Sequence, residues 1–182
     1  MPENTAASDS TIRTTVTAPA EASRRPNWRW HLFLRLLSAY PPFLGAGIRV
    51  RPVRHEGEEA VEARMRLAWW NRNAVGTHFG GSLYSMCDPF FALILLQRLG
   101  RGYTVWDKAA TIRFRRPGRG TVRALFSIPE QRVREIRAAA GRGERFEPTF
   151  TTTVVDGEGQ VIAEVEKLLY VRRQDPPPPA AG

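Results

Sequence analysis

The sequence is poor in several residue types. It has one cysteine, Cys87, so it can form neither a disulfide framework nor a multi-cysteine metal site. Its three histidines, His31, His55 and His78, are too dispersed to predict a metal site. The longest uninterrupted apolar run, Pro89 to Leu96, is too short to span a bilayer. We therefore expect no bound metal and no transmembrane segment.

Lysine is also scarce. Lys108 and Lys167 are the only two lysines, so 25 of the 27 basic residues are arginine. Against 18 acidic residues, this gives the 182-residue chain a net charge of +9, which would suit nucleic acid, an anionic lipid surface or a phosphorylated small molecule. Biased coding also produces so uniform an arginine content, so the charge alone does not choose a partner. The hydrophobic fraction of 42% is too high for a disordered protein.

Both ends of the sequence differ in composition from its middle. Residues 1–25 are rich in Ala, Thr, Ser and Pro, lack apolar periodicity and carry charges that cancel, which is typical of a disordered tail. They also lack the apolar stretch of a secretory signal, so we expect a cytoplasmic protein. Residues 174–182 are predicted to form a proline-rich tail. A single folded domain is predicted over residues 26–173.

The domain is predicted to begin with an amphipathic helix over residues 26–42, regular from 28 to 40. One face collects apolar residues and the opposite face polar ones, with Trp28, Leu32, Phe33, Leu36, Leu37 and Tyr40 on the first and His31, Arg35 and Ser38 on the second. The prolines at 41 and 42 end the helix. We expect the apolar face to pack on the rest of the domain. The less common alternative is that residues 28–40 contact a membrane surface.

Alternation of apolar and polar residues then predicts five to six strands. Strands with one buried face and one solvent face suit an antiparallel sheet. The alternating or β-branched stretches are 48–52, 61–69, 112–114, 122–128, 150–155 and 161–165. The turn residues 156–159 join the last two strands into a hairpin.

Two further helices interrupt the strands. A short one over 129–140 ends at Gly141. A longer one, at about 79–100, is apolar on nearly every side between Gly80 and Leu99, which is typical of a buried helix. The prediction is an α+β fold, in which an antiparallel sheet wraps around one long buried helix and an extra helix precedes it.

Residues that can carry chemistry cluster around this long helix. Gly80 and Gly81 leave backbone N–H groups at its start that can hold an anion or a polarised carbonyl oxygen. Asp88 lies in the middle of the apolar helix, where a carboxylate is costly unless it is paired or functional. A hydrogen bond to a loop and a catalytic role explain it equally well. Pro89 removes one helical N–H, so a kink is expected beside the carboxylate.

These residues belong to a longer motif, Asn73-x-x-Gly76-x-His78-x-Gly80-Gly81, followed by Asp88. The motif resembles that of the hotdog-fold thioesterases, particularly the phenylacetic-acid-pathway type. Residues 76–84, 106–108 and 114–118 are more similar to an uncharacterised bacterial branch of that superfamily. The resemblance covers about residues 40–172 and implies the hotdog fold. The chain departs from the family motif where Phe79 separates His78 from Gly80, and where Pro89 follows Asp88.

The resemblance implies roles for the matching residues. The backbone N–H of Gly81, with that of Gly80, would polarise a thioester carbonyl, and Asp88 would act as general base for water or as nucleophile. Asn73 would orient the water or the carbonyl. His78 would shape the start of the helix, and a histidine that only bonds within a loop is an equally good explanation. The implied substrate is a coenzyme A thioester, with no other cofactor.

Other residues near the motif are candidates for substrate binding. Tyr84 and Ser85 lie about one turn before Asp88 and could hydrogen-bond it. Three arginines could clamp the phosphates of coenzyme A or form a solvated strand face: Arg113, Arg115 and Arg116. Asp107 and Lys108 are expected to pair with each other at the start of a strand.

Helix geometry predicts the quaternary structure. Gly81 and Asp88 are seven residues apart, which is about 10 Å along a helix, so one carbonyl group cannot touch both. A shared site needs Gly81 from one chain and Asp88 from another, across a two-fold axis. We therefore expect a homodimer, or a dimer of dimers, with sites at the interface.

Three functions remain in order of preference. The first is an acyl-CoA thioesterase-like enzyme with Asp88 essential, and the second is a non-catalytic acyl-CoA or lipid-binding module with the same pocket. The third is a basic nucleic-acid or membrane-surface protein, for which the sequence supplies charge but no recognition motif. We therefore predict a small-molecule acyl thioester as ligand, and no nucleic acid.

Overall fold

The structure is a computed structural model that describes residues 27–141 and 143–174, so the predicted tails lie outside the described residues apart from Gln174. Within these ranges the helices are α1 (Trp28–Leu36), α2 (Pro41–Ala46), α3 (Gly80–Ser85), α4 (Phe90–Leu99) and α5 (Glu130–Ala140), with a 3-10 turn at Leu37–Ala39. The strands are β1 (Ile48–His55), β2 (Glu58–Arg66), β3 (Tyr103–Phe114), β4 (Thr121–Phe126), β5 (Thr149–Val155) and β6 (Val161–Arg173).

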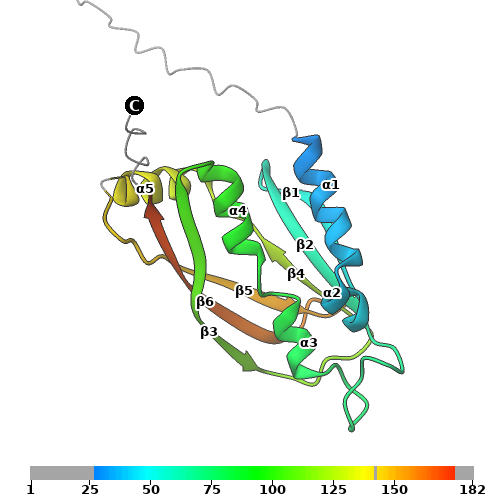
Figure 1. Cartoon of the computed structure of the whole chain (residues 1–182). Helices are drawn as coiled ribbons and strands as arrows, with labels where there is room; N and C mark the ends of the chain where they lie inside the picture. Colours follow the sequence, from blue (N-terminus) through cyan, green and yellow to red (C-terminus); the bar gives the residue numbers. More distant parts are fainter. Residues whose placement is uncertain (1–26, 142, 175–182) are drawn as a thin grey trace, which may run out of the picture.

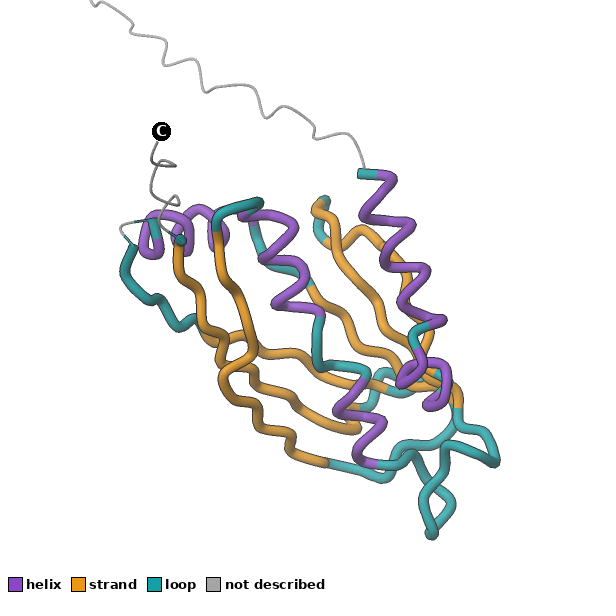
Figure 2. The backbone as a smooth tube through the Cα atoms, in the orientation of Figure 1, coloured by secondary structure: helices purple, strands orange, loops and turns teal. Residues whose placement is uncertain are grey.

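The strands form one antiparallel sheet in the order β1-β2-β4-β5-β6-β3. Figures 1 and 2 show the sheet curving around α3 and α4, while α1 lies beside β1 and β2 and the loop before α3 projects from one end. This confirms the predicted α+β fold, including the hairpin of β5 and β6. β3 is longer than the alternation predicted because it is an edge strand with few buried side chains, so its sequence shows little alternation.

The core lies between the helices and the concave face of the sheet. Most of α4 is buried, and the rings of Phe90 and Phe91 lie 4.8 Å and 5.3 Å from the ring of Phe126. Phe91 also stacks on Phe150 of β5 at 5.0 Å. Each ring removed from water contributes about 1.5–3 kcal/mol to stability. This packing fixes α4 against the middle of the sheet.

The long helix is divided in two at the expected kink. α3 ends at Ser85, and Pro89 is the N-cap of α4. Proline suits this place because it has no N–H to donate to the preceding turn. The interruption puts Asp88 between two helical segments rather than inside one.

The N-terminal helix differs from its prediction in orientation. The residue that α1 buries is Leu34, and Trp30 and Leu37 pack beside it. The prediction of which face packs on the domain is wrong, since Trp28 and Leu36 of the apolar face are exposed. Polar residues on the opposite face contact the domain instead. His31 Nε2 lies 3.2 Å from Glu59 Oε1, and the Ser38 hydroxyl accepts a hydrogen bond from the Val50 N–H.

The prolines after α1 end that helix and also begin the next one. Tyr40 is extended, and Pro41 is the first residue of α2, where a fixed φ and a missing N–H are both tolerated. α2 returns to the core through Phe43, whose ring lies 6.0 Å from that of Phe90.

Among the described residues, no helix combines the length and the apolar character that a membrane span requires.

Candidate active site

Asp88 lies at the break between α3 and α4. Its neighbours Met86, Cys87 and Phe90 are buried, so the backbone is fixed on both sides. The Asp88 side chain is nevertheless 48% exposed. The carboxylate is therefore held in place and still open to solvent.

A buried lysine on β6 holds this carboxylate. The Nζ atom of Lys167 donates to Asp88 Oδ1 at 2.8 Å and to the hydroxyl of Tyr84 at 3.2 Å, and it lies 3.0 Å from Asp107 Oδ2. The Lys167 side chain is completely buried. Burying an ammonium group is tolerated only when it is paired and hydrogen-bonded, and here two carboxylates and a phenol supply the partners.

The charges of this cluster shift its pKa values. Burial alone would lower the pKa of Lys167, but the hydrogen bonds and charges of Asp88 and Asp107 outweigh it and raise that pKa above 10.5. Burial is the main reason that the pKa of Asp107 is raised, and Lys167 opposes it. Burial likewise raises the pKa of Tyr84, assisted by its hydrogen bond to Asp88. Lys167 is thus a permanent cation at neutral pH.

Sequence reasoning missed Lys167, although the strand pattern contained a signal. The buried positions of β6 alternate as Ala163, Val165, Lys167, Leu169 and Val171. A lysine at a position where the alternation requires an apolar residue is the same anomaly as Asp88 in an apolar helix. Two such anomalies of opposite charge predict a pair.

The expected pairing of Asp107 with Lys108 is wrong. The pairing of β3 with β6 shifts register between Asp107 and Ala109, so Lys108 lies at an irregularity of the strand, where its side chain is exposed. Asp107 faces Lys167, while the Lys108 ammonium donates to both carboxylate oxygens of Glu147 at 2.8 Å.

The loop before α3 is held by its own amides. The Asn73 side chain donates to the hydroxyl of Thr77 at 2.9 Å and to the carbonyl of His78 at 3.3 Å, and it accepts from the N–H groups of Val75 and Thr77. Asn71, which sequence reasoning did not single out, is buried and donates to the carbonyls of Ala46 and Arg66. The structure therefore shows Asn73 organising its loop, away from the Lys167 cluster.

His78 ties this loop to the connection between β3 and β4. It is buried, its backbone N–H donates to Gly118, and its Nε2 lies 3.1 Å from the carbonyl oxygen of Gly120. Burial lowers the pKa of His78, partly offset by the hydrogen bond to Gly120. The ring is therefore neutral near pH 7, and the contact is one in which the Nε2–H donates.

Gly80 and Gly81 begin α3 beneath two aromatic rings. A Cβ on Gly80 would lie 3.0 Å from the ring of Phe114, and a Cβ on Gly81 would lie 2.5 Å from the ring of Phe79. Among the described residues, no side chain caps α3. Phe79, the residue that the family motif lacks, therefore lies against the glycine whose N–H the resemblance assigns to the thioester carbonyl.

A pocket of about 530 Å³ opens beside these glycines. α2, the loop and α3 supply its lining, which includes Ala46, Trp70, Arg72, Phe79, Gly81 and Ser85. The hydroxyl of Ser85 donates to the carbonyl of Gly81 at 2.9 Å and not to Asp88. The structure thus places Ser85 with Gly81 in the pocket, and Tyr84 with Asp88 in the cluster around Lys167.

The three candidate arginines lie at the end of β3, on an exposed surface. Arg115 donates to Glu164 at 2.7 Å, which raises the pKa of Arg115 through that hydrogen bond, and Arg116 donates to Gln160. Arg113 is exposed on the face opposite to Ile112. Two of the three are therefore engaged with β6 and the hairpin turn.

The single cysteine does not add a reactive group to the site. Burial raises the pKa of the Cys87 thiol to about 12, so it is a protonated thiol at neutral pH. In the described part of the chain, no group of three or more histidine, cysteine or acidic side chains is arranged to hold a metal ion.

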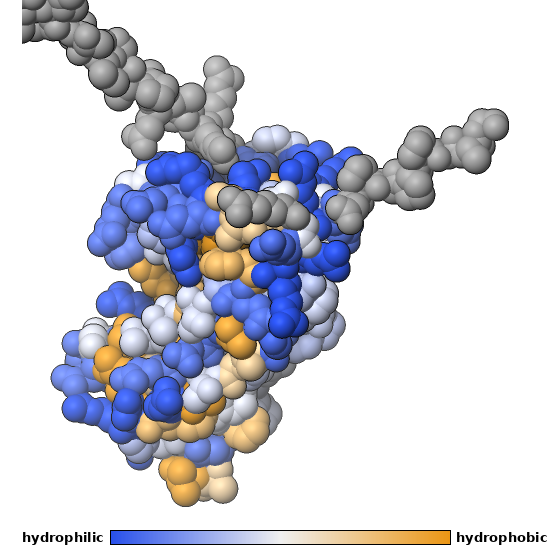
Figure 3. Space-filling view, turned by 90° about the vertical axis from the view of Figure 1, so that its left-hand side faces the viewer, coloured by the Kyte–Doolittle hydropathy of each residue, from blue (hydrophilic) through white to orange (hydrophobic). Residues whose placement is uncertain are grey.

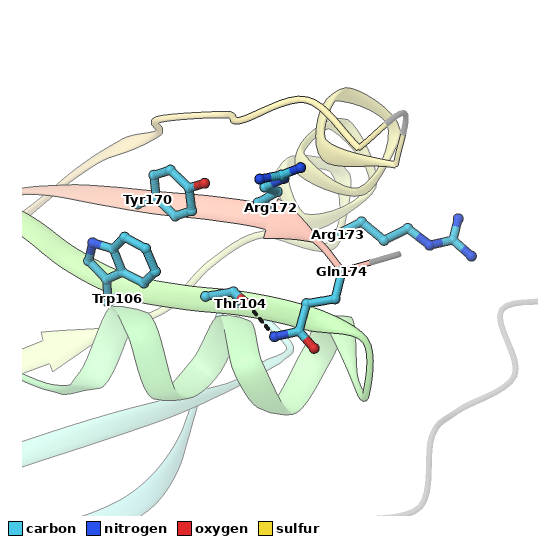
Figure 4. A pocket seen from close by; sticks show the side chains of 6 residues that line it. All are labelled: Thr104, Trp106, Tyr170, Arg172, Arg173 and Gln174. Carbon is cyan, nitrogen blue, oxygen red and sulfur yellow. Dashed lines mark hydrogen bonds between the residues drawn. The ribbon is translucent and has the colours of Figure 1, made fainter. Parts of the chain in front are cut away.

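A second hollow, of about 360 Å³, lies on the outer face of the sheet (Figure 4). The rings of Trp106 and Tyr170 stack there at 4.2 Å, and Gln174 donates to the hydroxyl of Thr104 at 2.7 Å. Trp106 precedes Asp107 and points to the opposite face of β3. This hollow is therefore separated from the Lys167 cluster by the sheet.

A family model described as a domain of unknown function, DUF4442, matches residues 29–171. The chain belongs to the DUF4442 family. No curated protein matches this DUF4442 chain in sequence.

Solved structures resemble this DUF4442 protein over most of its length. A Pseudomonas aeruginosa protein of unknown function, described as a probable thioesterase, is 25% identical with a TM-score of 0.69, covering 82% of this chain and 97% of that one. A Haemophilus influenzae thioesterase is 17% identical with a TM-score of 0.58, covering 79% and 90%. A Chlorobaculum tepidum protein of unknown function is 14% identical with a TM-score of 0.62, covering 81% and 94%. The protein therefore has the hotdog fold of thioesterase-like proteins, as the motif around Asp88 predicted.

Proposed function

We propose that this DUF4442 protein hydrolyses an acyl-CoA thioester, with Asp88 as the general base. The observation that carries the proposal is the state of Asp88, a half-exposed carboxylate anchored at a helix break by the buried ammonium of Lys167. A group that must accept a proton from water needs a fixed position and contact with solvent, and Asp88 has both.

The proposed reaction uses water as the nucleophile. Asp88 takes a proton from a water molecule as its oxygen attacks the thioester carbonyl carbon. The backbone N–H of Gly81 stabilises the negative charge that develops on the carbonyl oxygen. The carbon–sulfur bond then breaks, the coenzyme A thiolate takes the proton from Asp88, and a carboxylic acid and free coenzyme A leave.

The site is proposed to be shared between two copies of the chain. Gly81 lies in the pocket under Phe79, whereas Asp88 lies against β6, so the two groups of one chain act at different places. β3 is an edge of the sheet, and its exposed middle consists of the small residues 109–111. The other edge, β1, contains Pro52, which is confined to edges because it cannot donate to a ladder. Pairing of β3 with β3 of a second copy extends the sheet and brings α3 and the Asp88 break of the two copies together.

The test is release of free thiol from a panel of acyl-CoAs that differ in chain length and aromatic character. Asp88→Asn removes the base and keeps the shape, so we expect turnover to fall by roughly 10²–10⁴-fold. Asp156→Asn is the matched control, because its Oδ1 accepts the N–H groups of Glu158 and Gln160 in the hairpin turn and asparagine can accept them too. Equal turnover by Asp88→Asn and the wild type would remove the proposed role.

One observation favours a second function, non-catalytic binding of an acyl-CoA or a lipid. The ring of Phe79 occupies the space beside Gly81, 2.5 Å from where a Cβ would lie, and so narrows the approach to the glycine that catalysis needs. This function predicts that the wild-type protein binds acyl-CoA in a calorimetric titration and releases no thiol from any member of the panel. The same panel therefore separates the two functions.

A further inference from the structure

The N-terminal helix turns an apolar row away from the domain. Trp28, Leu32 and Leu36, four residues apart, share one side of α1 and are 70%, 48% and 61% exposed. Leu34 on the other side is completely buried. A helix that packs through one face normally exposes polar residues on the other. The exposed face of α1 is instead apolar and has no partner among the described residues.

Two further exposed apolar residues follow α1. Tyr40 is the extended residue before α2, and Leu44 lies on α2. We call Trp28, Leu32, Leu36, Tyr40 and Leu44 the outer row. α2 also lines the pocket beside Gly81, through Pro42, Gly45 and Ala46. Figure 1 shows α2 following directly on the end of α1, so the outer row ends on a helix that also lines the pocket.

The outer row lies in a strongly basic part of the chain. Residues 22–55 contain no aspartate or glutamate, and Arg29 and Arg35 flank the row on α1. Neither arginine takes part in an ion pair within the described ranges, 27–141 and 143–174. The acidic side chains of β2 contact other basic residues, Glu58 with Arg98, Glu59 with His31 and Glu62 with Arg51. The positive charge around the row is therefore available to a negatively charged surface.

We propose that the outer row docks the protein on an anionic lipid bilayer. Tryptophan and tyrosine favour the boundary between headgroups and acyl chains, leucine enters the acyl region, and arginine binds lipid phosphates. α1 presents all three kinds of side chain on its outer side. The side of the molecule turned away from α1 is different, because Figure 3 shows it as mainly hydrophilic, with its hydrophobic residues in separate patches.

A second copy of the chain fits the outer row less well. Two rows in contact would bring Arg29 and Arg35 of both copies together, and residues 22–55 supply no carboxylate to neutralise them. β1 and β3 are opposite edges of the sheet, so a dimer formed through β3 leaves α1 free. The docking does not depend on the proposed hydrolysis. If both hold, an acyl thioester dissolved in the membrane meets the pocket mouth directly.

The test is co-sedimentation of the full chain with vesicles. We expect binding to vesicles that are one-third phosphatidylglycerol and two-thirds phosphatidylcholine, and at least tenfold weaker binding to phosphatidylcholine alone. Leu32→Glu with Leu36→Glu should reduce binding to the anionic vesicles at least tenfold. Arg29→Glu with Arg35→Glu should reduce it by about fivefold or more for each arginine, and added salt should weaken wild-type binding.

The matched control for charge is Arg123→Glu with Arg134→Glu, which makes the same change at exposed residues of β4 and α5. We expect this variant to keep most of the binding.

Equal binding by the wild type and the Leu32→Glu, Leu36→Glu variant, with thermal unfolding showing both folded, would overturn the proposal. A change in oligomeric state on the same substitutions, measured by light scattering, would also overturn it by identifying a second copy as the occupant. Vesicle binding without any thiol release would contradict the proposed hydrolysis but would agree with the proposed docking.

Discussion

The Nζ atom of Lys167 lies 2.8 Å from Oδ1 of Asp88 and so joins strand β6 to the break between α3 and α4. Asp107 on β3 completes the contact, with its Oδ2 3.0 Å from the same ammonium group. Three elements far apart in sequence therefore meet at one buried cation. The position of the proposed base depends on the sheet as much as on the helix that carries it.

Replacing Lys167 should destabilise the fold. Lys167→Met leaves Asp88 and Asp107 side by side without a counter-charge, so we expect a loss of at least about 2 kcal/mol in the free energy of unfolding. Lys108→Met is the control, because the pair of Lys108 with Glu147 is exposed and is worth less than about 1 kcal/mol. Urea unfolding of the two variants measures the difference. Equal losses would show that the buried cation does not hold the cluster.

The same lysine should make stability fall at alkaline pH. The pKa of Lys167 in the folded state is raised above 10.5, so above that pH the unfolded chain loses its proton first and stability declines until the folded state also titrates. Lys167→Met lacks this contribution, and its stability should decline less between neutral pH and pH above 10.5. Parallel pH profiles for the wild type and Lys167→Met, from urea unfolding, would contradict the prediction.

Removing the ring of Phe79 should open the pocket. Phe79→Ala removes the ring that lies against Gly81, and because the ring is exposed we expect little change in stability, within about 0.5 kcal/mol. We expect kcat/KM for thiol release to rise several-fold, or acyl-CoA to bind more tightly if the protein is a binding module. Val75→Ala serves for comparison, since Val75 is an exposed apolar residue of the same loop that does not line the pocket. An unchanged or lower kcat/KM, with unchanged binding, would mean that the Phe79 ring does not limit access to Gly81.

A charge in the middle of β3 should separate the proposed dimer. Ala109→Arg places two arginines close together across the two-fold axis, where like charges directly opposite are destabilising. Light scattering after size exclusion should then show a monomer, and thiol release should fall with dimerisation. Thr151→Arg on β5, inside the sheet rather than at its edge, should remain a dimer. A wild-type protein that is already monomeric would exclude the shared site.

The strands and the divided helix could be predicted from the sequence because each has a local signal. Buried and exposed side chains alternate along β2, β4 and β6, and Pro89 marks the break before α4. β3 was predicted only over its last residues, since an exposed edge strand has no buried face to reveal it. β2 ends at Arg66 rather than Trp69, because apolar residues also occur in the exposed loop that follows.

The site was harder to predict because its contacts join distant residues. Asp88 was evident from its apolar surroundings, but its partner Lys167 is 79 residues away and required the strand register to be known. The orientation of α1 was predicted wrongly for a different reason. Periodicity shows which side of a helix is apolar, but not whether that side faces the sheet or the solvent.

The break between α3 and α4 gives the two halves of the site separate supports. Gly81 moves with α3 and with the loop that His78 pins to the β3–β4 connection, whereas Asp88 is tied through Lys167 to β6. A substitution in the loop at 71–79 therefore reshapes the pocket without displacing the carboxylate. The lining of the pocket and the position of the Asp88 carboxylate can therefore be altered independently of each other, because they are attached to different parts of the fold.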